Sequence, residues 1–267
     1  MKNRRPSIAV VKEWISSWDG ELTGQSYKPF LFVRDVPSEG KSAMFESATT
    51  GRVHHYFSAL EDETHALCEH DPDTGDIREQ FALLPHIATQ QIASRIGVKH
   101  PIYPGTTTSA VLTTDILLSK KRKDGVEHFA ISVKPEKELY DPKTGVRTLQ
   151  KLLIERLYWS LKSIEWILVT DKTLPRTRAK NLLFFAPART NELADNTLIS
   201  LAEFAATFRN EWADKTMLIS LVQNVALKLN IDVKAAQALL GRCVWDRSLL
   251  ISLDDEIISH ESYIKLI

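Results

Sequence analysis

Two strand-like runs on either side of an Asp-Gly pair restrict the fold of this chain more than any other feature. The runs are TTDILLS and EHFAISVKP, and KKRKDGV lies between them. Asp-Gly between such runs is a strong β-hairpin signal. A two-residue turn at Asp124 and Gly125 would place Asp115 directly opposite Lys134, with Cβ atoms about 5 Å apart on one face. The sequence therefore predicts a hairpin whose open end pairs a carboxylate with an ammonium group.

The elements around this hairpin predict an α/β domain over residues 1–172. Strand-like runs (30–36, 51–57 and 76–84), with a loop between the first two, and three helices (SIAVVKEWISSW, one beginning near Ser58, and HIATQQIASRI) precede it, and a long helix and the strand IEWILVTD follow it. LPRTRAKNLLFFAPART is interpreted as a linker with one buried segment. Helical patterns dominate residues 173–267, where two helices joined at Asn230–Asp232 precede the strand-like VWDRSLLISL. This order predicts a mainly helical, winged-helix-like domain.

The charge balance restricts how the chain could act on nucleic acid. The 267 residues include 34 basic and 34 acidic side chains, so the formal net charge is zero. A protein that holds DNA alone usually carries a basic excess, because phosphate neutralisation supplies much of the affinity. We expect any action on DNA to require partner proteins.

Several other classes of protein are not indicated. Cys68 and Cys243 are far apart and form no CxxC spacing, so neither a disulfide framework nor a zinc site is expected. There is no apolar run of the roughly 18 residues that span a bilayer, and the N-terminus lacks a signal-peptide pattern. We expect a cytoplasmic protein with no membrane partner.

The Asp115–Lys134 pair has two interpretations. A cross-strand ion pair at a sheet margin would contribute about 0.2–1 kcal/mol to stability. In a metal-dependent nuclease, a carboxylate would hold Mg²⁺ and the lysine would orient or deprotonate the attacking water. A nuclease needs a second carboxylate, and Glu61 is the best candidate. The competing interpretation of Glu61 is a capping box with Ser58.

These segments together resemble the TnsA family, the endonuclease subunit of the heteromeric transposases of Tn-seven-like elements. The resemblance rests on TGRVHHYFSALE, TTDILLS, KDGVEHFAISVKP and ERLYW, and it runs from about Lys28 to Lys172 in the same order throughout. It is weak in the C-terminal part. The family's catalytic glutamate, aspartate and lysine fall on Glu61, Asp115 and Lys134.

The resemblance implies a restriction-endonuclease-like domain, a winged-helix-like docking domain and a division of labour. Mg²⁺-dependent cutting would be directed at the 5′ strand of double-stranded transposon ends, while a DDE-type transposase subunit would cut and join the 3′ strand. An AAA+ ATPase regulator would dock through the C-terminal domain.

One position departs from the family pattern. Restriction-like sites usually carry Asp or Glu two residues before the lysine, and the TnsA pattern has Gln, but this chain has Ser132. The metal would then depend more on Glu61, Asp115 and the backbone carbonyl of Val133. Glu155 matches an acidic position of the family. Either it is an extra metal ligand or supports the metal ligands from behind, like Ser132, or it belongs to a solvated helix face beside Lys151, which is the favoured interpretation.

Two further groups of residues, a histidine pair and a basic run, have more than one interpretation. The adjacent His54 and His55 should point to opposite faces of a strand, which favours packing or hydrogen bonding over metal binding. The basic run Lys120, Lys121, Arg122 and Lys123 lies at the hairpin tip, where it is either a DNA contact or a solvated turn. Two other functions stay open: a free-standing restriction-like or junction-resolving nuclease, and a non-catalytic DNA-binding adaptor.

Overall fold

The computed structural model describes residues 5–35 and 42–267. The chain divides into two compact units, of which the first ends at Leu174 and the second runs from Pro175 to Ile267. This division is two residues from the boundary that the sequence pattern suggested. No helix in the described ranges is both long and apolar enough to cross a membrane.

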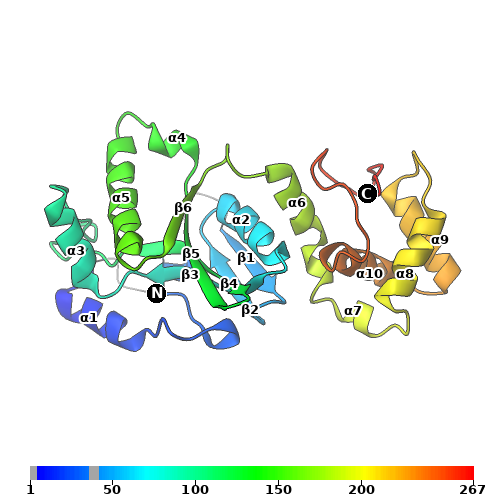
Figure 1. The fold of residues 1–267 in the computed structure, drawn as a ribbon, viewed down its shortest axis with the longest axis horizontal. Helices are drawn as coiled ribbons and strands as arrows, with labels where there is room; N and C mark the ends of the chain where they lie inside the picture. The colour runs from blue at the N-terminus through cyan, green and yellow to red at the C-terminus, as the bar shows by residue number, and fades with distance from the viewer. Residues whose placement is uncertain (1–4, 36–41) are drawn as a thin grey trace. The chain divides into compact units, whose positions relative to one another are not determined.

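A four-stranded sheet organises the first unit (Figure 1). Its spatial order is β3 (Thr74–Ala82), β4 (Thr113–Arg122), β5 (Gly125–Val133) and β6 (Glu165–Val169). Strand β4 is antiparallel to both β3 and β5, and β6 runs parallel to β5. Parallel strands need a crossover, which α5 (Gly145–Leu161) supplies. The N-terminal end of α5 therefore lies at the sheet end where β5 and β6 finish.

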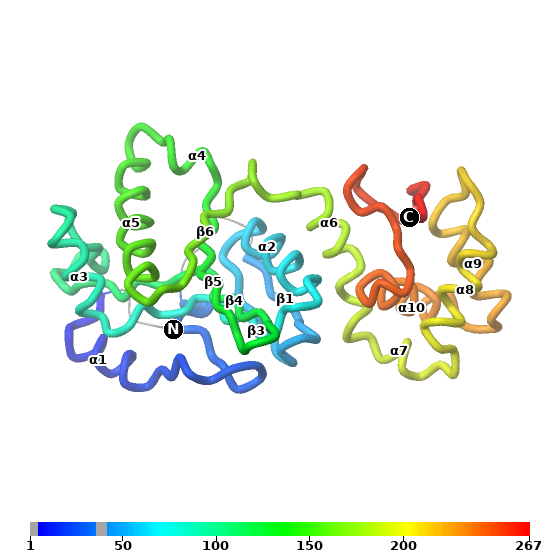
Figure 2. Tube along the Cα trace, in the orientation of Figure 1, coloured from blue at the N-terminus to red at the C-terminus, as the bar shows by residue number. Residues whose placement is uncertain are grey.

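The segment between β5 and α5 turns back sharply (Figure 2). It contains the short helix α4 (Glu136–Leu139) and the turn at Asp141, whose carboxylate accepts the backbone N–H of Thr144 at 2.7 Å. Glycine begins α5 because a Cβ at Gly145 would lie 2.5 Å from the carbonyl oxygen of Leu139. This close approach fixes the first turn of α5 beside the end of β5.

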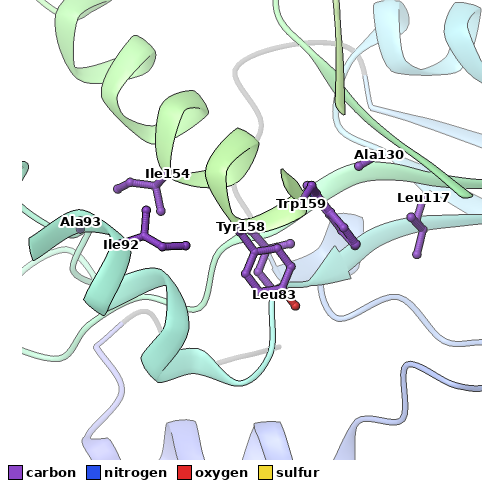
Figure 3. Packing of buried hydrophobic residues seen from close by; sticks show 8 residues of the cluster. All are labelled: Leu83, Ile92, Ala93, Leu117, Ala130, Ile154, Tyr158 and Trp159. Atoms are coloured by element: carbon purple, nitrogen blue, oxygen red, sulfur yellow. The ribbon is translucent and has the colours of Figure 1, made fainter. Parts of the chain in front are cut away.

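Apolar side chains of α5 and α3 (His86–Arg95) pack against the central strands (Figure 3). Ile154, Tyr158 and Trp159 of α5 are 0%, 3% and 1% exposed. They meet Leu117 and Ala130 of the sheet in one buried cluster. The predicted long helix thus forms because its apolar residues recur on one face.

The predicted hairpin forms, but its predicted register is wrong by two residues. Arg122 pairs with Gly125, so Lys123 and Asp124 make the turn, and Ile116 pairs with Ile131. Only Gly125 takes a positive φ, of 139°, whereas a turn centred on Asp124 and Gly125 would need positive φ at both residues. A shift of two leaves every side chain on its predicted face.

The first unit also contains helix α1 (Ile8–Ser17), a two-stranded sheet and a further helix. The sheet consists of β1 (Ala43–Ser47) and β2 (Arg52–Tyr56), and the further helix is α2 (Ala59–His70). The strand predicted at 51–57 and the helix predicted after Ser58 are confirmed, whereas β1 was predicted as a loop.

The strand predicted at 30–36 is wrong for its described residues, because Val33–Asp35 form a 3₁₀ turn, η2. The Asp35 carboxylate accepts the Phe32 N–H at 3.2 Å, and the Asp35 N–H donates to the Phe32 carbonyl at 2.8 Å. These local bonds replace strand pairing. Residue 36 lies outside the described residues.

The second unit is mainly helical. Its helices are α6 (Arg176–Phe185), η3 (Ala186–Ala188), α7 (Glu192–Asp195), α8 (Leu201–Glu211), α9 (Leu218–Leu229) and α10 (Val233–Trp245). The predicted helix–turn–helix is confirmed as α9 and α10. Asn230 ends α9 in the left-handed conformation, and the Asp232 carboxylate caps α10 by accepting the Lys234 N–H at 2.7 Å.

Two predictions in this unit are wrong. The expected linker contains α6, because Ala179, Leu182 and Phe185 recur at helical spacing and are buried. The expected strand at VWDRSLLISL begins inside α10, which continues to Trp245. In the described part of this segment only an isolated bridge, Ile251 with Leu266, has strand character.

Candidate active site

Asp115 of β4 and Lys134, just after β5, meet at the open end of the hairpin. The Lys134 Nζ lies 3.3 Å from Asp115 Oδ2 and donates to the Val133 carbonyl at 2.8 Å. The Val133 N–H donates to the same Asp115 oxygen at 2.7 Å. The side chains of Lys134 and Asp115 are 31% and 14% exposed. The ammonium therefore lies between two oxygens that the sequence suggested as metal ligands, at a point that solvent reaches.

Glu61 lies in the first turn of α2 and is 4% exposed. Its carboxylate accepts the Phe57 N–H at 3.1 Å and the Ser58 hydroxyl at 2.8 Å. The Ser58 hydroxyl oxygen accepts the Glu61 N–H at 3.2 Å. The capping interpretation of Glu61 is thus confirmed in a modified form, because its acceptors serve Phe57 and the Ser58 hydroxyl instead of the Ser58 amide.

Although Glu61 caps α2, its carboxylate still interacts electrostatically with Asp115 and Lys134. Burial, followed by the negative charge of Asp115, raises the pKa of Glu61 to about 7, against the opposing effect of Lys134. The capping carboxylate and the Asp115–Lys134 pair thus form one electrostatic group.

Glu155 is buried between α5 and the sheet. One of its oxygens, Oε1, accepts the Ser132 hydroxyl at 2.6 Å and the Thr114 hydroxyl at 2.8 Å. The alternative of a solvated helix face is therefore wrong for Glu155: its position on α5 faces the sheet, and the side chain meets two buried hydroxyls. Serine at position 132 is compatible with this arrangement because it is short enough to fit beneath the carboxylate.

Two tryptophans set the direction of these hydrogen bonds. The Trp166 indole N–H donates to Ser132 Oγ at 2.8 Å, and the Trp159 indole N–H donates to Thr114 Oγ1 at 2.6 Å. An indole N–H can only donate, so both hydroxyl oxygens accept and their protons point to Glu155. Sequence reasoning missed Thr114, Trp159 and Trp166. No local pattern signals them, because Thr114 lies 41 residues from Glu155 and 45 from Trp159.

The three carboxylates oppose one ammonium group. Burial and then the charge of Asp115 raise the pKa of Glu155 to about 7, although its hydroxyl donors lower it. Burial disfavours the charged form of Lys134, but Asp115, Glu61 and Glu155 together outweigh burial and raise its pKa above the ordinary value. Lys134 is therefore an ammonium ion at neutral pH.

The oxygen donors around Lys134 can be matched to the needs of a divalent cation. Within residues 5–35 and 42–267, no group of three or more His, Cys, Asp or Glu side chains is arranged to hold a metal ion. Mg²⁺ usually keeps several waters and binds through one or two carboxylates. Asp115 and the Val133 carbonyl fit that mode, since they already accommodate the Lys134 cation between them.

The histidine pair lies outside this site. His54 is fully buried, where its ring bonds Thr50 at 2.8 Å and Glu79 at 2.9 Å. Burial, with the neighbouring His65, lowers the pKa of His54 to about 4. His55 packs its ring edge-on against Phe32. The predicted hydrogen bonding of His54 and packing of His55 are confirmed.

The basic hairpin tip is partly neutralised by acids. Lys120 pairs with Asp71 at 2.6 Å. Arg122 pairs with Asp73 at 3.1 Å and with Glu127 at 2.7 Å. Lys121 and Lys123 are exposed. Half of the cationic run thus has anionic partners within the chain.

Comparisons with known proteins agree with these features. Residues 71–171 match the family described as TnsA-like endonuclease N terminal. The chain is 37% identical over 213 residues to the transposon Tn7 transposition protein TnsA of Escherichia coli, and the match covers 79% of this chain and 75% of that protein. Asp115, Lys134 and Glu155 all lie inside the matched residues. The chain belongs to the TnsA family.

Proposed function

We propose that this chain is a DNA endonuclease subunit of a cut-and-paste transposase. The observation that carries the proposal is the Asp115–Lys134 pair with the Val133 carbonyl, placed between the buried carboxylates Glu61 and Glu155 in a member of the TnsA family. Clusters of titratable groups with displaced pKa values mark functional sites more often than structural ones.

Each residue of the cluster has a chemical role in this proposal. Asp115, the Val133 carbonyl and Glu61 would hold Mg²⁺, with water completing its coordination. The bound metal would supply Lewis-acid stabilisation and a more acidic water. Lys134 keeps its proton at neutral pH, which suits stabilisation of negative charge on the phosphate better than abstraction of a proton. Ser132 and Thr114 would fix Glu155 behind the metal ligands.

The reaction would be hydrolysis of a phosphodiester. Water attacks phosphorus in line with the leaving 3′ oxygen, the bond from phosphorus to that oxygen breaks, and a 5′-phosphate and a 3′-hydroxyl result. The strand cut would be the 5′ strand of double-stranded transposon ends, while a DDE-type transposase subunit handles the 3′ strand. The zero net charge supports dependence on such partners.

The second unit would be the docking domain for an AAA+ ATPase regulator. Residues from Thr173 to Ile267 include 11 basic and 11 acidic side chains, which favours protein contact over independent DNA reading. A cavity of about 380 Å³ opens in this unit. Its lining includes apolar side chains such as Phe184, Leu218 and Val222 together with Lys234 and His260.

Strand-resolved cleavage tests the proposal. A transposon-end duplex labelled on each strand is incubated in Mg²⁺ with the cognate transposase, the ATPase and this chain, as wild type, Asp115→Ala or Lys134→Ala. Loss of 5′-strand cutting in both variants, with the 3′-strand reaction intact, is the expected result. If both variants cut the 5′ strand like wild type, the proposal is wrong.

The same assay separates the two alternatives. Robust cutting by the purified chain alone would favour a free-standing nuclease. Intact assembly and unchanged transposition with Lys134→Ala would favour a non-catalytic adaptor.

A further inference from the structure

The sheet-facing side of α5 changes character along the helix. Residues four apart lie on one face, and each such step rises about 6 Å. In the row of positions four apart that contains Trp159 and Glu155, both of these residues are buried, and the next two steps toward the N-terminus are the exposed Lys151 and the half-buried Arg147. Because the N-terminal end of α5 lies where β5 and β6 finish, these two steps lead toward the end of the sheet that carries Lys134, and the charge of Lys134 acts on Lys151.

The two cations are held without an acidic partner. The Arg147 guanidinium donates to the Lys99 carbonyl at 2.5 Å and to the Gln150 side-chain oxygen at 3.1 Å, which fixes its position. Lys151 is exposed. In the part of the chain that the structure describes, neither side chain forms an ion pair.

The positive charges lie close enough to repel one another. Partial burial of the otherwise exposed Lys151, and then the charges of Arg147 and Lys134, lower its pKa. Cations kept together in this way gain free energy when an anion binds between them. A phosphodiester backbone supplies such anions at short, regular intervals.

We propose that Lys151 and Arg147 bind phosphates of the DNA strand that is cut, on the α5 side of Lys134. This inference rests on the proposed function, since it assigns a further contact to the same substrate. It places the strand along the N-terminal half of α5, with Lys134 at the scissile phosphate and Arg147 farthest from it.

The test measures DNA binding in the absence of cleavage. A fluorescein-labelled transposon-end duplex is titrated with the complex of the full-length chain and its cognate transposase subunit in EDTA, and anisotropy is followed from about 50 to 200 mM salt. Each lost phosphate contact lowers the slope of log K against log salt by about 0.9, which is about eightfold in affinity at 0.1 M salt. We expect this loss for Lys151→Gln and about twice the slope change for Arg147→Gln with Lys151→Gln.

The chain offers a matched control on the same helix. Arg156→Gln removes one positive charge from an exposed residue that lies on the opposite side of α5. It should leave the slope unchanged, and Lys151→Arg should keep the wild-type slope. Since Arg147 also holds the loop after α3 through the Lys99 carbonyl, Lys151→Gln decides the outcome.

Two results would overturn the proposal: equal slopes for Lys151→Gln and Arg156→Gln, or no binding by wild type at about 50 mM salt. Its failure is distinguishable from failure of the nuclease. A chain whose cutting depends on Asp115 and Lys134 but whose slopes are equal fails only here. A chain that binds as expected but never cuts fails only as a nuclease.

Discussion

The two ends of the β4–β5 hairpin carry the same chemical pair in different surroundings. At the open end Lys134 lies 3.3 Å from Asp115, and at the turn end Lys120 lies 2.6 Å from Asp71. Both pairs are partly exposed. Judged by distance alone, the turn end holds the better ion pair.

The neighbours of the two pairs differ. At the turn, Arg122 adds a cation that Asp73 and Glu127 balance. At the open end, two buried carboxylates, Glu61 and Glu155, share one lysine with Asp115, and burial, followed by the negative charge of Asp115, raises the pKa of each to about 7. Buried carboxylates in excess of their cations, more than a short contact, distinguish a reactive site from a structural ion pair.

Removing one carboxylate charge at each end gives the largest expected contrast. Glu61→Gln keeps one acceptor oxygen for the Phe57 N–H, and its amide NH2 can donate to the Ser58 hydroxyl oxygen, so α2 should stay folded. It should lower 5′-strand cleavage in the complete assembly by about 10²–10³-fold, because a charged metal ligand is lost. Asp71→Asn should change the cleavage rate by less than about twofold. Equal rates for the two variants would reduce Glu61 to a helix cap.

The pH dependence of the free energy of unfolding should also differ between the open end and the turn end of the hairpin. The ordinary pKa of a glutamate is 4.5 and that of Glu155 here is about 7, so the folded state binds a proton that the unfolded state releases between these values. The free energy of unfolding should therefore fall as pH rises through this window, by up to about 3 kcal/mol for this group.

Glu155→Gln should remove that part of the decline, as measured by urea unfolding in EDTA across the same pH range. Asp71→Asn, at the turn, should keep the wild-type pH profile. A Glu155→Gln profile parallel to wild type would mean that Glu155 already titrates near its ordinary value.

Magnesium should stabilise the protein by binding at the open end of the hairpin and not at the turn end. At a Mg²⁺ concentration of about ten times Kd, the gain is about 1.4 kcal/mol, or roughly 3–6 °C in the calorimetric transition. Asp115→Asn should abolish this gain, since Asp115 is the carboxylate next to the Val133 carbonyl. Asp71→Asn should retain it. A gain of the same size in both variants would place the metal elsewhere.

Local sequence patterns predicted much of the structure around the hairpin. The turn signal and alternating pattern predicted the hairpin, and period two kept Asp115 and Lys134 on one face despite the wrong register. Ser58 predicted the start of α2. In contrast, the 3₁₀ turn η2 was missed because the side-chain acceptor of Asp35 outweighed the local apolar pattern. Helix α6 was missed although Ala179, Leu182 and Phe185 recur at helical spacing, because the segment was interpreted as a linker.

The environment of Glu155 was beyond sequence reasoning for a physical reason. Its partners Ser132 and Thr114 come from two neighbouring strands, and their orientation depends on Trp166 and Trp159. Such a network exists only after the sheet and α5 have packed. Helical spacing could place Glu155 on a face of α5, but it could not tell whether solvent or a hydroxyl covered that face.

The last prediction concerns the cations of the turn itself. Lys121→Gln combined with Lys123→Gln removes two exposed cations, and if both touch backbone phosphate the salt slope of DNA binding should fall by at most about 1.8. Lys120→Gln should leave that slope unchanged, because Asp71 already neutralises Lys120. Anisotropy with the transposon-end duplex in EDTA compares the three proteins. A larger loss for Lys120→Gln than for the double variant would show that DNA displaces Asp71, and the turn end would then share the phosphate-binding character proposed for α5.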